Sequence, residues 1–127
     1  AIVGGKQGIH SHTMTQNIAC LNAISREYHM ERLWISAQDA EDLGVQTGDT
    51  VEVASSEHVG QVEARVTQRL KPGVVFLPTH YGGDSPAQTR AYRYGIALTD
   101  FIPFDMEPGV GSMMSQEVAV TVKKVEA

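Results

Sequence analysis

The chain has 127 residues, of which 42% are hydrophobic and 20% are charged, so it is long enough to bury one core and is composed to fold. Its formal net charge of -5 excludes a general nucleic-acid or membrane-surface binder, because neutralising a run of phosphates needs a surplus of basic residues. The single cysteine, Cys20, excludes a disulfide framework and any zinc or iron–sulfur site built from several cysteines of this chain alone.

The N-terminal segment combines a short apolar run with a long polar stretch. Residues 1–3 are predicted to form a buried strand that runs into a turn at Gly4-Gly5. Residues 6–17 follow with little apolar content and many hydrogen-bonding groups, so we expect a loop or an irregular extended segment there.

Apolar residues at near-helical spacing predict an amphipathic helix over 18–28. Asn17 is expected to cap its first turn. Cys20 shares a side of this helix with Ile24, and we therefore expect Cys20 in the core rather than as a nucleophile.

A second strand and a second helix follow directly. Residues 33–35 are apolar and are predicted as a short strand. Ser36 and Asp39 have the spacing of a capping box and Gly44 supplies a stop, which predicts a helix over 37–43.

The remaining chain mostly alternates apolar and polar residues, as strands do. Strands are predicted over 50–54, 61–67, 74–77 and a last segment containing Val118, Val120 and Val122, with turns at 46–49 and 55–60. From 79 to 116 the chain is polar and glycine-rich, and only 96–98 resembles a strand; so long a connection is usually functional. These elements predict a mainly β fold with short helices, a closed barrel.

The densest polar segment is 10–17, which contains two imidazoles, three hydroxyls and two amides just before a predicted helix. Hydroxyls and backbone N–H groups at a helix N-terminus donate well to phosphate oxygens, and Lys6 adds a positive charge nearby. Gln16 and Asn17 have the groups to pair with the amide edge of a purine or pterin. The alternative is that these groups satisfy one another within a loop.

A second polar cluster, 77–83, follows a predicted buried strand and contains His80, Tyr81 and two glycines. Glycines let a ligand approach the backbone closely, whereas the alternative is an ordinary turn in which the imidazole packs on Tyr81. A metal site made by His10, His12 and His80 is the less favoured reading, because no carboxylate stands beside them to orient an imidazole.

No self-contained active site emerges from the remaining chemistry-bearing residues. His29 and His58 fall in predicted surface turns and are expected to be solvated, and the serines lack a nucleophile motif. No residue is therefore assigned to catalysis or to a metal, and the chain is predicted to be a binding domain.

Three stretches together resemble the C-terminal molybdopterin dinucleotide-binding domain of the dimethyl-sulfoxide-reductase superfamily. The first joins Gly5-Lys6 to the polar segment 10–17, which is similar to the family's Gly-basic, His and Thr-x-Thr pattern. The second is 34–51, with Asp39-Ala40, Leu43-Gly44-Val45 and Gly48-Asp49-Thr50-Val51. The third is 71–82, with Lys71-Pro72-Gly73 leading into Pro78-Thr79-His80-Tyr81-Gly82. The three stretches occur in the family's order and cover nearly the whole chain.

The resemblance implies a double-psi β-barrel that binds molybdopterin guanine dinucleotide, with molybdenum or tungsten held by a ligand outside this segment. By the same carry-over, the cofactor-binding residues are Lys6, Gln7, Gly8, His10, His12, Thr13, Thr15, Gln16, His80 and Tyr81. Many relatives have an asparagine where this chain has Ala97, and the frequent Pro-Glu-x-Lys is replaced by 113–116, so fewer contacts are expected from the C-terminal third.

Within the superfamily, Thr15-Gln16-Asn17 and the tail 108–112 look most like the thiosulfate, polysulfide and arsenate reductase branch. We therefore expect residues 1–127 to be one domain of a larger catalytic subunit, inert alone, next to other domains of that subunit and an iron–sulfur electron-transfer subunit. The start at Ala1, without an initiator methionine, fits an excised segment. The resemblance favours a periplasmic or cell-envelope location over the alternative of the cytoplasm, and no nucleic acid or direct membrane insertion is expected.

Two other functions remain open from the sequence. One is a stand-alone small cofactor-binding subunit of the formylmethanofuran dehydrogenase type. The other is a β-barrel that binds protein and no cofactor, although 10–17 lacks the aromatic and arginine anchors of a protein-binding hot spot.

Overall fold

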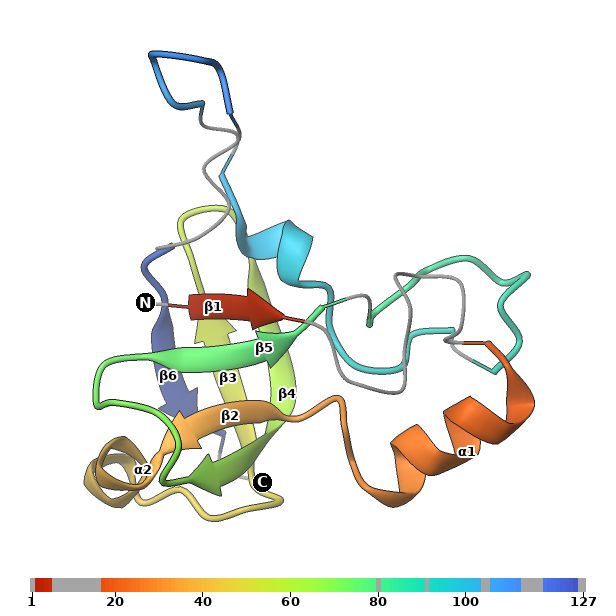
Figure 1. Ribbon diagram of the computed structural model, residues 1–127. Helices are drawn as coiled ribbons and strands as arrows, with labels where there is room; N and C mark the ends of the chain where they lie inside the picture. The colour runs from red at the N-terminus through yellow and green to blue at the C-terminus, as the bar shows by residue number, and fades with distance from the viewer. Residues whose placement is uncertain are drawn as a thin grey trace.

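The computed structural model describes residues 2–5, 17–79, 81–90, 92–103, 106–112 and 118–125 (Figure 1). The strands are β1 (Ile2–Gly5), β2 (Leu33–Ser36), β3 (Thr50–Ala54), β4 (Val59–Thr67), β5 (Val75–Pro78) and β6 (Thr121–Lys124). The helices are α1 (Ala19–Glu27), α2 (Ala37–Leu43) and the 3₁₀ helix η1 (Leu98–Phe101). None of the helices in the described ranges is long and apolar enough to cross a membrane.

The strands form one sheet in the order β1-β5-β2-β4-β3-β6, and this sheet closes on itself. The pairs β1–β5 and β2–β4 are parallel, whereas β2–β5, β3–β4 and β3–β6 are antiparallel. Ile2 of β1 bridges to Val118, just before β6, and its N–H donates to the Val118 carbonyl at 2.8 Å. In Figure 1, β1, β5 and β2 cross in front of β3, β4 and β6. The predicted mainly β barrel with short helices is confirmed.

Alternation along the strands fills the interior of the barrel. In β3, Val51 and Val53 are fully buried while the residues between and beside them are partly exposed, as a strand with one core face requires. Leu33 and Ile35 of β2 enter the same cluster. The central strands thus carry the period-2 pattern that predicted them.

The helix α2 forms where its local signals predicted it. The Ser36 hydroxyl accepts a hydrogen bond from the Asp39 N–H at 3.2 Å, and Gly44 ends the helix in the left-handed conformation with φ of 69°. Lys124 of β6 donates to the Gly44 carbonyl at 3.0 Å. Both ends of this short helix are therefore satisfied by hydrogen bonds.

Two predictions about the chain trace are wrong. Gly4 and Gly5 do not form a turn but continue β1, in register with Leu77 and Pro78 of β5. An added Cβ at Gly4 would lie 2.1 Å from a methyl group of Leu98, so glycine is needed here for close packing. Residues 96–98 do not form a strand, because Leu98 begins η1 instead.

The helix α1 is present as predicted, but its orientation is not the expected one. Its buried residues are Asn22 and Ser25, whereas Cys20 is exposed, so the prediction that Cys20 lies in the core is wrong. Asn17 is not the cap either. The N-cap is Ile18, without a side-chain hydrogen bond, and the Asn17 side chain accepts from the Arg90 N–H at 2.7 Å.

Candidate functional site

The two segments predicted to bind a ligand leave the barrel from neighbouring strand ends. In the parallel pair β1–β5, Gly5 is in register with Pro78, so both strands end at the same edge. Beyond this point the Thr79 N–H and hydroxyl both donate to the Gly5 carbonyl, at 2.8 and 3.1 Å. The chain that follows Gly5 and the chain that follows Thr79 therefore start side by side.

Most of the predicted cofactor-binding residues lie outside the described residues. These are Lys6, Gln7, Gly8, His10, His12, Thr13, Thr15, Gln16 and His80, a set that includes the three histidines of the alternative metal site. Tyr81 is described, and its place can be stated. The structure therefore locates the start of each predicted segment and the Tyr81 side chain. The other assignments stay predictions.

Tyr81 is buried and joins the segment after β5 to α1. Its hydroxyl lies 2.8 Å from the Ser25 hydroxyl, and its ring meets the Tyr94 ring edge-on at a centroid distance of 5.7 Å. Residues 81–90 and 92–97, which we call the 81–97 loop, are closed by hydrogen bonds from the Gly82 N–H to Tyr94 and from the Arg93 N–H to Gly83. Tyr81 therefore anchors this loop.

Tyr94 adds a second attachment between the loop and the end of α1. Its hydroxyl donates to the Glu31 carboxylate, and the Arg26 guanidinium lies 4.0 Å from its ring centroid. Burial, and then the hydrogen bond to Glu31, raise the pKa of Tyr94. The phenol is therefore a neutral hydrogen-bond donor throughout the physiological range.

The inner face of α1 is polar because it packs on loop backbone. Arg26 donates to the Arg90 carbonyl at 2.8 Å and to the Asn22 side chain at 3.0 Å. Asn22 itself donates to the Arg90 carbonyl at 3.4 Å. An irregular loop has backbone groups that no strand satisfies, so polar side chains of the helix face it.

A small polar cleft of about 250 Å³ lies where this loop crosses itself. Its lining includes Gly82 and Ala97 and the ion pair between Arg93 and Asp84, whose Nε and Oδ1 are 2.7 Å apart. His58, expected to be solvated, is exposed and also lines the cleft, with its ring 5.0 Å from that of Phe101. The volume is below that of a typical pocket for a drug-sized ligand, so the cleft accommodates at most part of a larger cofactor.

Replacing Tyr81 with phenylalanine is expected to lower the free energy of unfolding by about 1–2 kcal/mol, because the buried Ser25 hydroxyl loses its partner. Removing both hydroxyls, with Ser25→Ala added, is expected to restore most of the loss. Urea unfolding of the two single variants and the double variant measures this coupling. Additive losses would show that the two hydroxyls do not interact.

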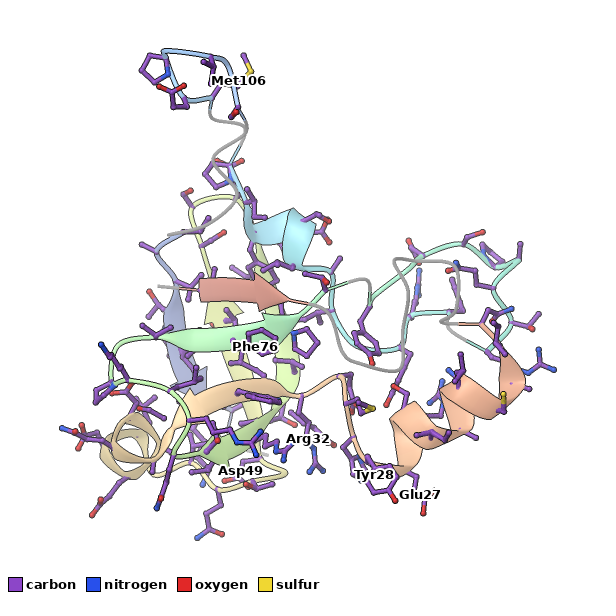
Figure 2. All side chains as sticks on the ribbon, viewed as in Figure 1. Glu27, Tyr28, Arg32, Asp49, Phe76 and Met106 are labelled. Atoms are coloured by element: carbon purple, nitrogen blue, oxygen red, sulfur yellow. The ribbon has the colours of Figure 1, made fainter. Side chains whose placement is uncertain are left out.

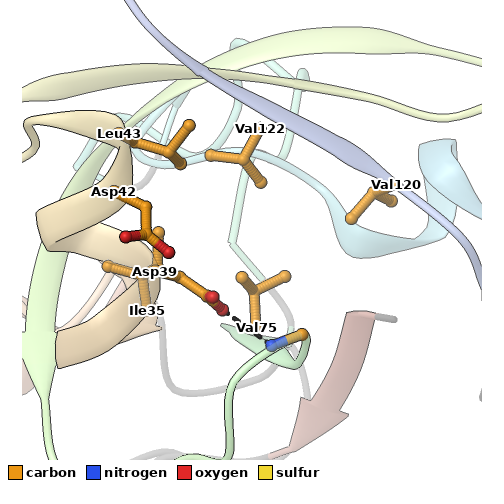
Figure 3. A pocket seen from close by; sticks show the side chains of 8 residues that line it. Ile35, Asp39, Asp42, Leu43, Val75, Val120 and Val122 are labelled. Atoms are coloured by element: carbon orange, nitrogen blue, oxygen red, sulfur yellow. Dashed lines mark hydrogen bonds between the residues drawn. The ribbon is translucent and has the colours of Figure 1, made fainter.

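A second hollow, of about 290 Å³, lies beside α2 on another part of the barrel (Figure 3). Its walls are mostly apolar and include Val75, Val120 and Val122. The carboxylates of Asp39 and Asp42 are also part of the lining. The Asp39 carboxylate accepts from the Gly73 N–H at 2.7 Å. Two carboxylates and no cation among these residues make the hollow unsuited to a phosphate-containing ligand.

Among the described residues, His29, Glu31 and Glu63 are the group whose side chains come close enough to suit a metal, with ligand atoms within 4.8 Å of one another. His29 is exposed, as expected. Glu31 accepts from Tyr94, and Glu63 is paired with Arg32 at 3.0 Å. These protein partners account for both carboxylates without an ion.

Sequence reasoning missed the residues that hold the loop in place. Ser25, Arg26, Glu31 and Tyr94 have no motif, and their roles depend on contacts 56 to 69 residues apart along the chain. The one local signal is the position of Asn22, a polar residue on the side of the predicted helix opposite the apolar residues. A polar side of this kind looks the same in a sequence as an ordinary solvent-exposed face.

Comparison with known proteins gives this site a context. A family model described as Molydopterin dinucleotide binding domain matches residues 1–116. The molybdopterin-containing subunit of thiosulfate reductase from Salmonella typhimurium is 24% identical over 112 residues, 88% of this chain and 14% of that protein. The alpha subunit of F420-dependent formate dehydrogenase from Methanocaldococcus jannaschii is 34% identical over 82 residues, 65% of this chain and 12% of that protein. The chain thus spans about one seventh or less of these relatives.

A solved structure agrees with the fold. Acetylene hydratase from Pelobacter acetylenicus superposes with a TM-score of 0.75 at 11% identity, over 98% of this chain and 18% of that one. With the closed six-stranded sheet and its two parallel pairs, the predicted double-psi β-barrel is confirmed.

Proposed function

This chain belongs to the molybdopterin dinucleotide-binding domain family, and we propose from that premise that it holds this cofactor at the shared end of β1 and β5 within a larger molybdenum or tungsten oxidoreductase. The observation that carries the placement is the Gly5–Thr79 contact, at which the two segments predicted to bind the cofactor start side by side. The relatives named for their molybdopterin or dehydrogenase function support an oxidoreductase.

The described residues at this end fit one part of such a cofactor. Two parallel strands end side by side close to a small polar cleft, which gives room for one polar part of the cofactor. The lining of this cleft includes the Arg93–Asp84 ion pair and Asp100. Thr13, Thr15, His10 and His12 would add side-chain donors from the first segment, and His80 from the second. When bound, the pterin holds the metal and carries electrons to and from it, while the protein contributes orientation and electrostatics.

For the reaction class we propose a thiosulfate- or polysulfide-reducing enzyme. Support comes from the thiosulfate reductase subunit, which aligns with 88% of this chain, and from Thr15-Gln16-Asn17 with the tail 108–112. A formate dehydrogenase is the second candidate, because the relative from Methanocaldococcus jannaschii is more similar, at 34% identity, over a shorter stretch. Under the first proposal an iron–sulfur subunit would deliver electrons to the catalytic subunit, whereas under the second it would accept electrons from it. For the first we also propose a periplasmic or envelope location.

The proposal is tested by changing Thr13 and Thr15 to valine in the full catalytic subunit. Each substitution removes a hydroxyl donor to a charged ligand at similar side-chain volume, so we expect cofactor retention to fall by at least about tenfold. The measurement is the molybdenum, tungsten and pterin content after gel filtration. Thr121→Val, at an exposed position in β6, is the matched control and should retain the cofactor.

Unchanged retention in the threonine variants would show that this loop does not hold the cofactor. A parent subunit that contains neither metal nor pterin would overturn the proposed function itself. Assays of the loaded parent with thiosulfate, polysulfide and formate then separate the two reaction classes, because only the correct substrate should be turned over.

A further inference from the structure

The chain on either side of position 80 is attached to two different parts of the fold. On one side, the Thr79 N–H donates to the Gly5 carbonyl of β1 at 2.8 Å. On the other side, the Gly82 N–H donates to the Tyr94 carbonyl at 2.8 Å, and the Tyr81 ring meets the Tyr94 ring edge-on. The barrel therefore fixes one flank of this position, and Tyr94 fixes the other.

Tyr94 is itself held by Glu31, a residue of the connection between α1 and β2. The side chain of Glu31 is only 11% exposed, and its Oε2 accepts the hydrogen bond from the Tyr94 hydroxyl. A hydrogen bond to a carboxylate is charge-assisted and stronger than one between two neutral groups. The other acceptor near the hydroxyl is the neutral Ser25 carbonyl, at 3.3 Å. Glu31 therefore contributes most to holding the hydroxyl of Tyr94 in place.

Gly95 brings Glu31 and Tyr81 close together. A Cβ added at Gly95 would lie 2.8 Å from the Tyr81 Cβ and 3.2 Å from the Glu31 Cβ. Both side chains therefore pack against the backbone of the same glycine, and no other side chain fits between them. Because close-packed groups transmit displacements to their neighbours, a shift of Glu31 or Tyr94 also moves Tyr81, the residue that follows position 80.

We infer that Glu31 and Tyr94 are positioning residues for the cofactor: Glu31 holds the Tyr94 hydroxyl, and Tyr94 sets the backbone directly after His80, which is predicted to contact the cofactor. The inference rests on the proposed function. Neither residue has to touch the cofactor, because both act on the flank that β1 does not fix. By linkage, a cofactor that binds best with this flank in place also stabilises the contact between Glu31 and Tyr94.

The inference is tested in the full catalytic subunit loaded with its cofactor. The protein is held at a raised temperature, and the metal and pterin that remain bound after gel filtration are measured with time. Tyr94→Phe removes the hydroxyl and keeps the ring, and we expect it to lose cofactor about tenfold faster than the parent. Glu31→Ala should have a similar effect. Glu31→Gln keeps an acceptor for the phenol, so its rate should stay within about threefold of the parent rate.

Two control variants separate positioning from the loss of any hydroxyl and from a general loss of stability. Tyr28→Phe removes a hydroxyl at the end of α1, away from the barrel (Figure 2), where Tyr28 is 67% exposed. Val53→Ala weakens the core at a fully buried position of β3 without changing a residue of the 81–97 loop. Both should lose cofactor within about twofold of the parent rate.

Hydrogen exchange supplies a second readout that does not depend on turnover. In the parent, residues 81–90 and 92–97 should exchange more slowly in the loaded subunit than after removal of the cofactor, because binding and the Glu31–Tyr94 contact are linked. Tyr94→Phe should reduce this difference, and Tyr28→Phe should preserve it.

Cofactor loss from Tyr94→Phe at the parent rate, or an equal acceleration in Val53→Ala, would overturn the positioning role. So would a Glu31→Gln variant that loses cofactor as fast as Glu31→Ala, since the hydrogen bond would then not be what acts. A parent subunit that contains neither metal nor pterin would instead refute the proposed function, and with it the premise of this inference. The two failures are therefore distinguishable.

Discussion

Replacing Phe101 with alanine is expected to lower the free energy of unfolding by about 3–5 kcal/mol, the range for removing a buried aromatic side chain. Phe101 is fully buried at the end of η1, and it is the largest of the side chains that the described residues bury this completely. A Cβ added at Gly60 would lie 3.1 Å from its ring, and the His58 ring lies edge-on to it at 5.0 Å. The substitution leaves a cavity that a closed sheet cannot collapse to fill.

The measurement is urea unfolding followed by the fluorescence of Trp34, the single tryptophan. Val110→Ala is the control, because Val110 is 86% exposed and its change should stay within about 0.5 kcal/mol. A loss below about 1 kcal/mol for Phe101→Ala would mean that η1 does not anchor the long connection to the barrel.

The part of the fold that the sequence predicts correctly is the part fixed by local interactions. The α2 helix follows from a cap at Ser36 and a left-handed glycine at Gly44, both within one short segment. The β3–β4 hairpin follows from alternation on two adjacent runs. In these elements the residues that decide the structure are close in sequence, so pattern and structure agree.

The errors arise where distant contacts override the local pattern. Apolar periodicity placed Cys20 in the core, but the loop that packs on α1 needs hydrogen-bond donors and therefore selects the polar side. Ile96 and Ala97 look like a strand, yet they run against the backbone at Gly82 and pair with none of the described strands. Gly4-Gly5 looks like a turn, yet it is a strand whose missing side chains make room for Leu98 and Phe76.

The candidate site follows the same division. The resemblance implies that both polar segments contact the cofactor. The parallel pairing of β1 with β5 gives this a physical basis, because parallel strands end at the same edge. The network of Tyr81, Ser25 and Tyr94 that orders the second segment could not be predicted, since it depends on how a loop folds back over a helix. Its integrity nevertheless decides the shape of the cleft.

Gly82 is the position where this network is most sensitive to substitution. Its φ is 77°, a left-handed conformation that costs other residues about 1–2 kcal/mol. A Cβ there would also lie 2.4 Å from the Ala97 nitrogen and 2.6 Å from the Ile96 carbonyl carbon, both backbone atoms that no rotamer change can move. Overpacking of this kind adds about 1–3 kcal/mol, so we expect Gly82→Ala to lose about 2–5 kcal/mol in all.

The matched control for this prediction is Gly73→Ala, because Gly73 has a similar φ of 84° with no atom within 4 Å of an added Cβ. The difference between the two variants therefore isolates the collision from the backbone strain, and urea unfolding measures it. Hydrogen exchange should also show faster opening of 81–90 and 92–97 and of α1 in Gly82→Ala only, because separating Gly82 from Ala97 pulls on the Tyr81–Ser25 contact. Equal losses in the two variants would mean that the loop does not cross itself at Gly82, and the cleft assigned to part of the cofactor would lose its wall.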